Sequence, residues 1–384
     1  MQSPSLKPRI QTVDIIRGFA VFGILLVNIP DMVGNGLHFG TRNTGLDALL
    51  RLLYDLFVQT KFYTIFSFLF GLSFYLFMDR AEEKGKNARS LFKRRLWILL
   101  VIGLIHLILL WFGDILHVYA IAGFFLLLFY KRMPRTLFIW GMVLSSFCTL
   151  IVGMTYVLTM YRPELSLSLN FTSVPNLAER WDYAITHVPT NLIALLFEVL
   201  GLFLFGLYAG KKQWFEKKER FYSQRVKRAQ WISLVISLLL FVPILYAYFT
   251  HDVYDSNHVI FYIFLSGKSL AVFYIATWLR VIARFGERPF RSLAAVGRMA
   301  LTNYLSHTIL LFVLLRWIWP DIGAAYWMGT VTAIAIMALQ LIASSLWLRS
   351  YTMGPVEWLW RAGTYGHFVP LKRDQASTSS HLPM

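Results

Sequence analysis

The stretch that decides the fold is LWILLVIGLIHLILLWFGDILHVYAIAGFFLLLF, residues 96–129, where only Gly113-Asp114-Ile115-Leu116-His117 interrupts two long apolar runs. A run of roughly 20 apolar residues is long enough to cross the hydrocarbon core of a bilayer as a helix. Two such runs joined by so short a connection predict a tight helical hairpin whose turn carries polar side chains. The main solvent of this part of the chain is therefore expected to be lipid.

Apolar runs of this kind recur along the whole chain. Of its 384 residues, 57% are hydrophobic and only 15% are charged, so the chain is far more apolar than an ordinary soluble domain. The runs centre near Ile24, Leu69, Leu104, Phe124, Ser146, Leu200, Leu239, Leu270, Leu310 and Ala335. The sequence predicts an all-α, polytopic transmembrane bundle of about ten spans.

The basic residues fall between the apolar runs, in alternate loops. Lys and Arg number 37 against 20 acidic residues, and they gather in four loops, at 80–95, 131–135, 211–228 and 280–298. Because cytoplasmic loops carry the excess of Lys and Arg, this alternation predicts that both termini are cytoplasmic in a bacterial inner membrane. Topology then accounts for the net charge of +17, which excludes nucleic acid as the expected partner. The single Cys148 excludes an intramolecular disulfide and a thiolate metal cluster.

The basic loop at 211–229 is the natural divider of the chain. It separates an N-terminal membrane half, residues 1–210, from a C-terminal half, residues 230–370, and a polar, disordered tail is expected at 371–384. Residues 46–57 are too short to cross a bilayer and place Asp47, Arg51 and Asp55 at helical spacing. This pattern indicates an interfacial or re-entrant helix, whose polar stripe is equally consistent with simple solvation.

The hairpin turn holds the first candidate for chemistry. Asp114 and His117 are three residues apart, close enough for the carboxylate to orient the imidazole and raise its basicity. By the predicted topology the turn faces the outer side of the membrane. The same residues would also occur in a hydrogen-bonded turn that merely satisfies helix ends, and both interpretations stay open.

Ionisable and polar groups inside the other spans are further candidates, since such groups face a cavity or a partner. Asp14 and Arg17 lie one helical turn apart, as an ion pair or with Arg17 reaching toward the membrane surface. Glu198 and Lys268, each flanked by apolar residues, form either a buried pair or part of an ion or substrate path. The remaining polar positions lie along one helix and make either an interhelical network or a cavity wall: Asn303, Ser306 and His307. No histidine spacing picks out a metal.

Five ordered motifs carry a resemblance to a known family over nearly the whole chain. They are VDIIRGFAVFGILLVN (13–28), KFYTIFSFLFGLSF (61–74), FKRRLWILLVIGLIH (92–106), GDILHVYAI (113–121) and GRMALTNYLSHTI (297–309). The chain resembles the YeiB-like bacterial membrane proteins, a family without a settled biochemical function. More distantly it is similar to the heparan-alpha-glucosaminide N-acetyltransferases and the wider group of transmembrane acyltransferases.

The distant resemblance implies a second candidate for the catalytic base. In the glucosaminide acetyltransferases the first span reads much like Asp14, Arg17 and Asn28 here, and the catalytic histidine follows at the spacing of His38. His38 therefore inherits the role of acetyl relay or general base by resemblance. In the acyltransferases that modify surface polysaccharides, a histidine stands where this chain has Asn28, so that pattern is broken. A histidine in a loop rich in Gly and Asn is also often just a polar loop residue.

An acyl-CoA donor would place its phosphates at the cytoplasmic ends of the spans, where Arg and Lys bind them. The candidates for this contact are Arg17, Arg94, Arg95 and Arg298. Each of these arginines is equally explained as an anchor at the membrane surface. No glycine-rich phosphate loop of the Walker or dinucleotide type is present.

Three functions remain open on the sequence. The first is a transferase that moves an acyl group, as acetyl, from acyl-CoA to a small-molecule, glycan or lipid acceptor at the outer face. The second is a small-molecule or ion-coupled transporter, against which stands the lack of an internal repeat. The third is a non-catalytic membrane partner whose polar residues hold helices together. Each of these functions would allow a homo-oligomer.

Overall fold

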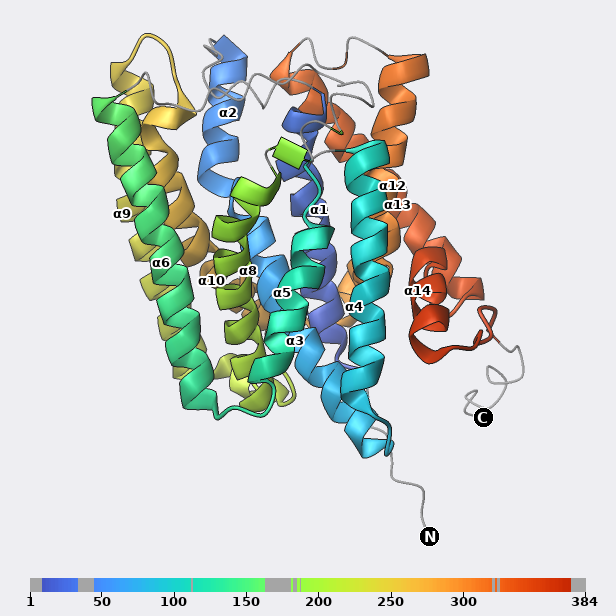
Figure 1. The fold of residues 1–384 in the computed structure, drawn as a ribbon. Coiled ribbons are helices and arrows are strands. Elements are labelled where there is room, and N and C mark those ends of the chain that lie inside the picture. The colour runs from blue at the N-terminus through green and yellow to red at the C-terminus, as the bar shows by residue number, and fades with distance from the viewer. Residues whose placement is uncertain are drawn as a thin grey trace.

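The computed structural model describes residues 9–33, 45–111, 113–162, 185–186, 188–319 and 325–373, together with Trp181 and Ile322. Over these residues the chain folds into helices that stand side by side in one bundle (Figure 1). The predicted all-helical architecture is confirmed, and among the described residues the strand-like pairing is limited to one isolated bridge, between Tyr351 and Lys372. His38 lies outside the described residues.

Most of the helices are long enough to cross a bilayer. The longer ones are α1 (Gln11–Met32), α3 (Lys61–Glu83), α4 (Ala88–Ile105), α6 (Pro134–Tyr161), α8 (Val188–Lys211), α9 (Gln224–Thr250), α10 (Ile260–Phe285) and α13 (Tyr326–Ser350). The shorter ones are α2 (Gly45–Phe57), α5 (Leu116–Phe129), α11 (Arg291–Arg298), α12 (Ala300–Val313) and α14 (Pro355–Tyr365). Single π-helical turns extend α4 as η1 (His106–Leu110) and α12 as η6 (Leu314–Ile318).

Each of the ten predicted apolar runs coincides with a helix. Within the described residues, 8 helical segments are both long and apolar enough to cross a membrane, which makes the protein an integral membrane protein. The two other runs correspond to α4, whose first eight residues include four basic ones, and to α5, which has only 14 residues. These two helices nevertheless form the expected hairpin, so the number of spans depends on how this hairpin lies in the bilayer.

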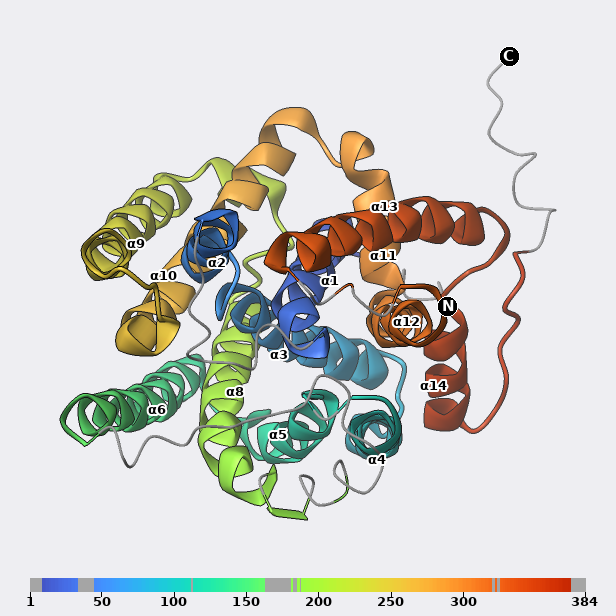
Figure 2. The same ribbon diagram turned by 90° about the horizontal axis from the view of Figure 1, so that it is seen from above.

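Two helices occupy the centre of the bundle. Viewed from above, α1 and α3 lie inside a ring formed by the other long helices (Figure 2). In the most apolar stretch of α1, 72% of the residues are buried, against 28% in α6 and 28% in α9. Much of α6 and α9 therefore faces outward from the bundle, whereas most side chains of α1 face protein.

Glycines bring the central helices close to their neighbours. A Cβ atom on Gly18 of α1 would overlap the backbone of Leu293 in α11, and one on Gly297 would overlap the backbone of Asp14. Gly71 of α3 meets the backbone of α8 in the same way. Small residues let two helix backbones approach closely. In a bilayer the lipid is as apolar as the helix surface, so this close packing is what drives two helices to associate. The contact holds α11 firmly against the first turns of α1.

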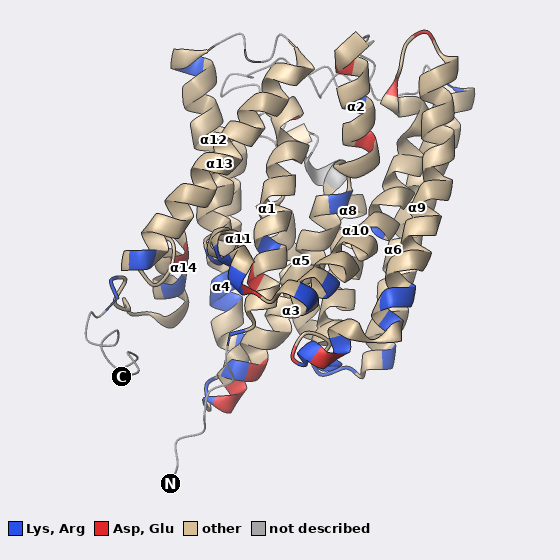
Figure 3. Cartoon of the chain, turned by 180° about the vertical axis from the view of Figure 1, so that it is seen from behind, with Lys and Arg blue, Asp and Glu red and all other residues tan. Residues whose placement is uncertain are grey.

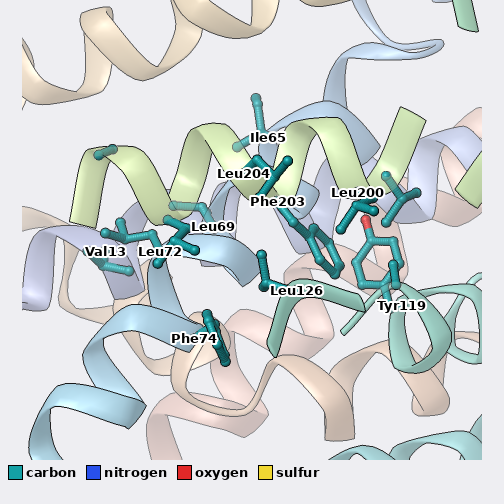
Figure 4. Packing of buried hydrophobic residues seen from close by; sticks show 14 of the residues in the cluster. Val13, Ile65, Leu69, Leu72, Phe74, Tyr119, Leu126, Leu200, Phe203 and Leu204 are labelled. Atoms are coloured by element: carbon teal, nitrogen blue, oxygen red, sulfur yellow. The ribbon is translucent and has the colours of Figure 1, made fainter. Parts of the chain in front are cut away.

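The largest cluster of buried apolar side chains joins α3, α5 and α8. Leu69, Tyr119 and Phe203 are each almost completely buried in it (Figure 4). Phe203 stacks on Phe70 with ring centroids 4.4 Å apart. This packing fixes α5, and therefore the hairpin turn at its start, against the central helix α3.

Helix α2 matches the short segment predicted at 46–57, but its polar stripe is not solvated. Thr60, with φ of 68°, breaks the helix and α3 begins at Lys61. Arg51 and Asp55 are buried, and Arg51 Nε lies 3.2 Å from Asp55 Oδ1. The simple solvation of this stripe is therefore the wrong interpretation: the stripe faces the inside of the bundle.

Charged side chains are unevenly distributed along the bundle. Figure 3 shows Lys and Arg gathered toward the end at which α1 begins and α3 ends, which we call the basic end. The hairpin turn before α5 lies toward the opposite end (Figure 1). By the positive-inside rule the basic end is expected to face the cytoplasm.

Candidate functional site

The hairpin turn places Asp114 and His117 in contact, as their spacing predicts. Asp114 Oδ2 lies 3.3 Å from His117 Nδ1 and also accepts a hydrogen bond from the His117 backbone N–H at 3.3 Å. Both residues are buried, at 4% and 5% exposure. The carboxylate therefore contacts the imidazole, as the spacing predicts, and also accepts from the first turn of α5, as expected for a hydrogen-bonded turn.

Three further side chains, which the sequence did not single out for this site, complete the cluster. His106, in η1, brings its Nδ1 to 3.0 Å from Asp114 Oδ1, and Tyr304 of α12 donates its hydroxyl to the same oxygen at 3.0 Å. The other nitrogen of His106 lies 2.9 Å from Thr308 Oγ1. Asp114 thus accepts four hydrogen bonds in a buried setting, which stabilise its charged form.

These contacts determine which nitrogens of the two imidazoles are available. A carboxylate accepts only, so Nδ1 of His106 and of His117 each carries the hydrogen that points at Asp114. Nε2 of His106 then accepts from the Thr308 hydroxyl. Nε2 of His117 makes no hydrogen bond with any described residue. Within the described residues, His117 Nε2 is therefore the ring nitrogen of this cluster whose lone pair is not already used in a hydrogen bond.

A second charged group lies at the start of α1. Arg17 Nη1 is 2.8 Å from Asp14 Oδ1, so the predicted ion pair is formed. Arg9 also donates to Asp14, at 2.9 Å through Nη2, and Arg17 reaches Ser73 Oγ at 2.8 Å. Asn28, three turns further along α1, is half-buried and takes no part in this group. The pair anchors α1 to α3 at the basic end.

The four arginines predicted to hold acyl-CoA do not form one group. Arg298 lines a cavity of about 660 Å³ beside Asp14, and Arg17 is bonded to the same carboxylate. Arg95 instead stacks on Trp360 of α14, with the guanidinium carbon 3.6 Å from the ring centroid. Arg94 is exposed on α4. Arg17 and Arg298 therefore lie close to the same carboxylate, Asp14, whereas Arg94 and Arg95 lie on α4.

The remaining polar candidates divide into two interhelical groups. Lys268 Nζ lies 3.0 Å from Glu198 Oε2, which confirms the buried pair between α8 and α10, and Lys268 also donates to Ser145 Oγ at 2.8 Å. On α12, the network reaches α13 through Gln340, which lies 2.6 Å from His307 Nε2 and donates to Ser306 at 2.7 Å.

Asn303 extends this second group by donating to Ser344 at 3.0 Å. The contacts between α12 and α13 are those of a polar network that joins two helices. Among the described residues, no group of three or more His, Cys, Asp and Glu side chains is arranged to hold a metal ion.

Comparison with known proteins gives one consistent result. Residues 209–367 match a family model described as "Protein of unknown function (DUF418)". The uncharacterized protein YxaH of Bacillus subtilis is 32% identical, with 97% of this chain and 98% of the relative covered. The chain belongs to this YeiB-like family. Its other relatives include an uncharacterized 39.9 kDa protein from Bacillus acidopullulyticus, 30% identical over 97% of this chain and 98% of the relative, and YeiB of Escherichia coli, 26% identical over 91% and 94%.

Proposed function

We propose that this YeiB-like protein is a membrane acyltransferase that moves an acyl group from acyl-CoA to a hydroxyl or amine acceptor. The observation that carries the proposal is the imidazole of His117, oriented by Asp114 through Nδ1 and open at Nε2. A neutral imidazole held in this way is suited to remove a proton from an acceptor near neutral pH. The resemblance of the first span to the glucosaminide acetyltransferases supports the same reaction class.

The reaction needs one base and good positioning. His117 Nε2 takes the proton of the acceptor hydroxyl or amine, whose oxygen or nitrogen then bonds to the thioester carbonyl carbon. The carbon–sulfur bond breaks, and the coenzyme A thiolate leaves and recovers the proton from His117. Asp114 stabilises the imidazolium formed between these steps, in the manner of the carboxylate in a catalytic triad.

His106, Tyr304 and Thr308 act on this reaction as positioning residues. His106 and Tyr304 hold Asp114 Oδ1 from two different helices, and Thr308 fixes the ring of His106. A base that is held by rigid helices needs little reorganisation during the reaction. We place the donor at the basic end and the acceptor at the opposite face of a bacterial inner membrane, as the positive-inside rule predicts.

The experiment is transfer of labelled acetyl from acetyl-CoA into a lipid and glycan extract of the bacterial envelope, by protein purified in nanodiscs. We expect His117→Ala to lower transfer by about 10²- to 10⁴-fold, as loss of a general base does. His367→Ala, at an exposed histidine outside the cluster, is the matched control and should transfer label at the wild-type rate. Equal transfer by wild type and His117→Ala would show that His117 is not the general base. The variant His38→Ala tests the competing histidine directly.

A transporter is the second candidate, because Glu198 and Lys268 form a buried pair between two helices. A carrier that uses this pair would take up a solute in an ion-dependent manner, and Glu198→Gln would abolish the uptake. Under the acyltransferase proposal the pair holds α8 to α10, so Glu198→Gln should leave acetyl transfer per folded molecule unchanged.

A further inference from the structure

The cavity at the basic end has an unusual charge balance. Its volume is about 660 Å³, and its charged lining comes from Asp14 and from five arginines, Arg9, Arg291, Arg298, Arg349 and Arg373. These arginines belong to four separate parts of the chain: the residues before α1, helix α11, the last turn of α13 and the segment after α14. The fold therefore assembles the basic lining from segments that are distant in sequence.

The acidic residue cannot neutralise this lining. Asp14 already accepts from Arg9 and Arg17. Arg291, Arg349 and Arg373 form no ion pair with a described carboxylate. Positive charges that crowd without a counter-ion raise the free energy of the site, and a bound anion removes this cost.

Arg298 is the arginine that most directly indicates a missing acceptor. Its Nη2 donates to the carbonyl of Thr352 at 2.8 Å, whereas its Nε is buried and has no hydrogen-bond partner among the described residues. Burial, followed by the positive charges of Arg9 and Arg373, lowers the pKa of Arg298. A buried donor without an acceptor destabilises the folded state, because its hydrogen bond to water is lost and no hydrogen bond within the protein replaces it.

The walls of the cavity are held in place by backbone contacts. The close approach of Gly297 to the backbone of Asp14 fixes the helix that carries Arg298. The segment that carries Arg373 is joined to the end of α13 by two backbone hydrogen bonds, from Arg373 to Ser350 at 3.0 Å and from Thr352 to Leu371 at 2.9 Å. The arginines are thus presented by an ordered frame.

We propose that this cavity is a binding site for an anion that carries phosphate groups. The planar guanidinium offers two parallel N–H donors that match phosphate oxygens, and several arginines from different elements can hold two phosphates at once. The volume lies within the range of small-molecule sites, about 300–1,000 Å³. Two sources share this chemistry: the phosphates of coenzyme A and the headgroup of an anionic phospholipid such as cardiolipin. The site does not depend on the acyltransferase proposal, since a lipid would occupy it in a protein without enzymatic activity.

The test measures binding of both sources to the full chain. Coenzyme A is titrated by calorimetry into protein in phosphatidylcholine nanodiscs, with pantetheine, which lacks the phosphates, as the negative probe. Cardiolipin retention is measured by native mass spectrometry. The variants are Arg298→Gln and Arg349→Gln, and Arg135→Gln, exposed at the same end but outside the cavity, is the matched control.

We expect one of the two probes to bind. Each cavity variant should weaken its binding about tenfold, as expected for the loss of one charge-assisted hydrogen bond, and Arg135→Gln should leave the binding unchanged. If the cavity variants weaken the binding of coenzyme A, the cavity is a nucleotide site. If they weaken the retention of cardiolipin, it is a lipid site. His117→Ala should keep this binding, so failure of the acyltransferase proposal is distinguishable. The proposal is overturned if neither probe binds to protein shown to be folded, or if Arg135→Gln weakens binding as much as the cavity variants.

Discussion

Two buried carboxylates, Asp55 in α2 and Asp114 in the hairpin turn, differ in what balances their charge. Asp55 accepts from Tyr254 at 2.8 Å and Ser256 at 2.5 Å and is paired with Arg51. Asp114 accepts from a tyrosine and two histidines. An arginine is charged at every accessible pH, whereas an imidazole gains and loses its proton near neutrality.

The comparison separates a structural role from a chemical one. The arginine-paired cluster joins α2 to the segment before α10, and Lys61, completely buried, adds hydrogen bonds to the Asp55 carbonyl at 2.6 Å and to Ser266 at 3.1 Å. The histidine-paired cluster keeps one basic nitrogen open, and this makes it the place where proton transfer is expected.

The largest expected effect is on activity at Asp114. Asp114→Asn keeps the size of the side chain but favours the wrong tautomer of the imidazole, so acetyl transfer should fall by about 10²- to 10⁴-fold. The thermal midpoint in detergent should stay within a few degrees of wild type. Asp252→Asn, in an exposed loop, is the control that should change neither quantity. If Asp114→Asn loses transfer only because it unfolds, the role of Asp114 is structural, like that of Asp55, and the distinction between the two clusters is lost.

The next largest effect is on stability at Arg51. Arg51→Ala leaves the carboxylate of Asp55 buried without its cation, which costs about 3–5 kcal/mol. The midpoint of thermal unfolding, followed by size-exclusion fluorescence, should drop strongly. The double variant Arg51→Ala/Asp55→Ala removes both charges and should recover part of the loss. A double variant less stable than either single one would show that the ion pair is not the cause.

Much of this contrast was accessible from the sequence, and the part that was not has a physical reason. Asp114 and His117 are three residues apart where the chain enters α5, so their spacing alone predicts the contact. His106, Tyr304 and Thr308 reach the same carboxylate only because the hairpin closes and α12 packs against it. Contacts of this range leave no local pattern in a single sequence.

Burial was the other quantity that the sequence did not provide. The spacing of Arg51 and Asp55 predicts one helical face, but it fits a solvated face as well as a buried one. Arg94 and Arg95 are neighbours of the expected kind at the expected end, yet Arg95 is used for stacking on Trp360. The basic cavity is lined by arginines from four segments that are distant in sequence, so no local motif predicts it.

A smaller loss of stability is expected at Glu198. Glu198→Gln removes the ion pair, but Lys268 keeps its hydrogen bonds to Ser145 and Thr149 and its side chain is 23% exposed. The loss should be about 1.5–3 kcal/mol, the range for a hydrogen bond to a charged group. The drop in thermal midpoint should therefore be clearly smaller than that of Arg51→Ala. A drop in thermal midpoint larger than that of Arg51→Ala would show that the Glu198–Lys268 pair stabilises the bundle more than the Arg51–Asp55 pair does.

The smallest effect is a pH dependence at Glu357 of α14, a carboxylate that has no ion pair with a described residue. It accepts from the backbone of Leu301 at 2.7 Å and of Thr302 at 3.0 Å, and burial raises its pKa. The folded state then binds the proton more tightly than the unfolded state. Stability therefore falls as pH rises from the unfolded pKa, near 4.5, through the raised folded one.

Thermal midpoints of wild type and Glu357→Gln across this pH range measure the effect. The variant carries no titrating proton at this position, so its midpoint should fall less steeply with rising pH. Parallel curves for the two proteins would show that other groups cause the whole dependence.

The most direct test of the central claim measures acetyl transfer per folded molecule and thermal midpoint on the same preparations of Asp114→Asn and Arg51→Ala. The account predicts that Asp114→Asn stays folded and stops transferring, whereas the Arg51→Ala molecules that remain folded transfer at the wild-type rate. Retained transfer in folded Asp114→Asn, or lost transfer in folded Arg51→Ala, would contradict it.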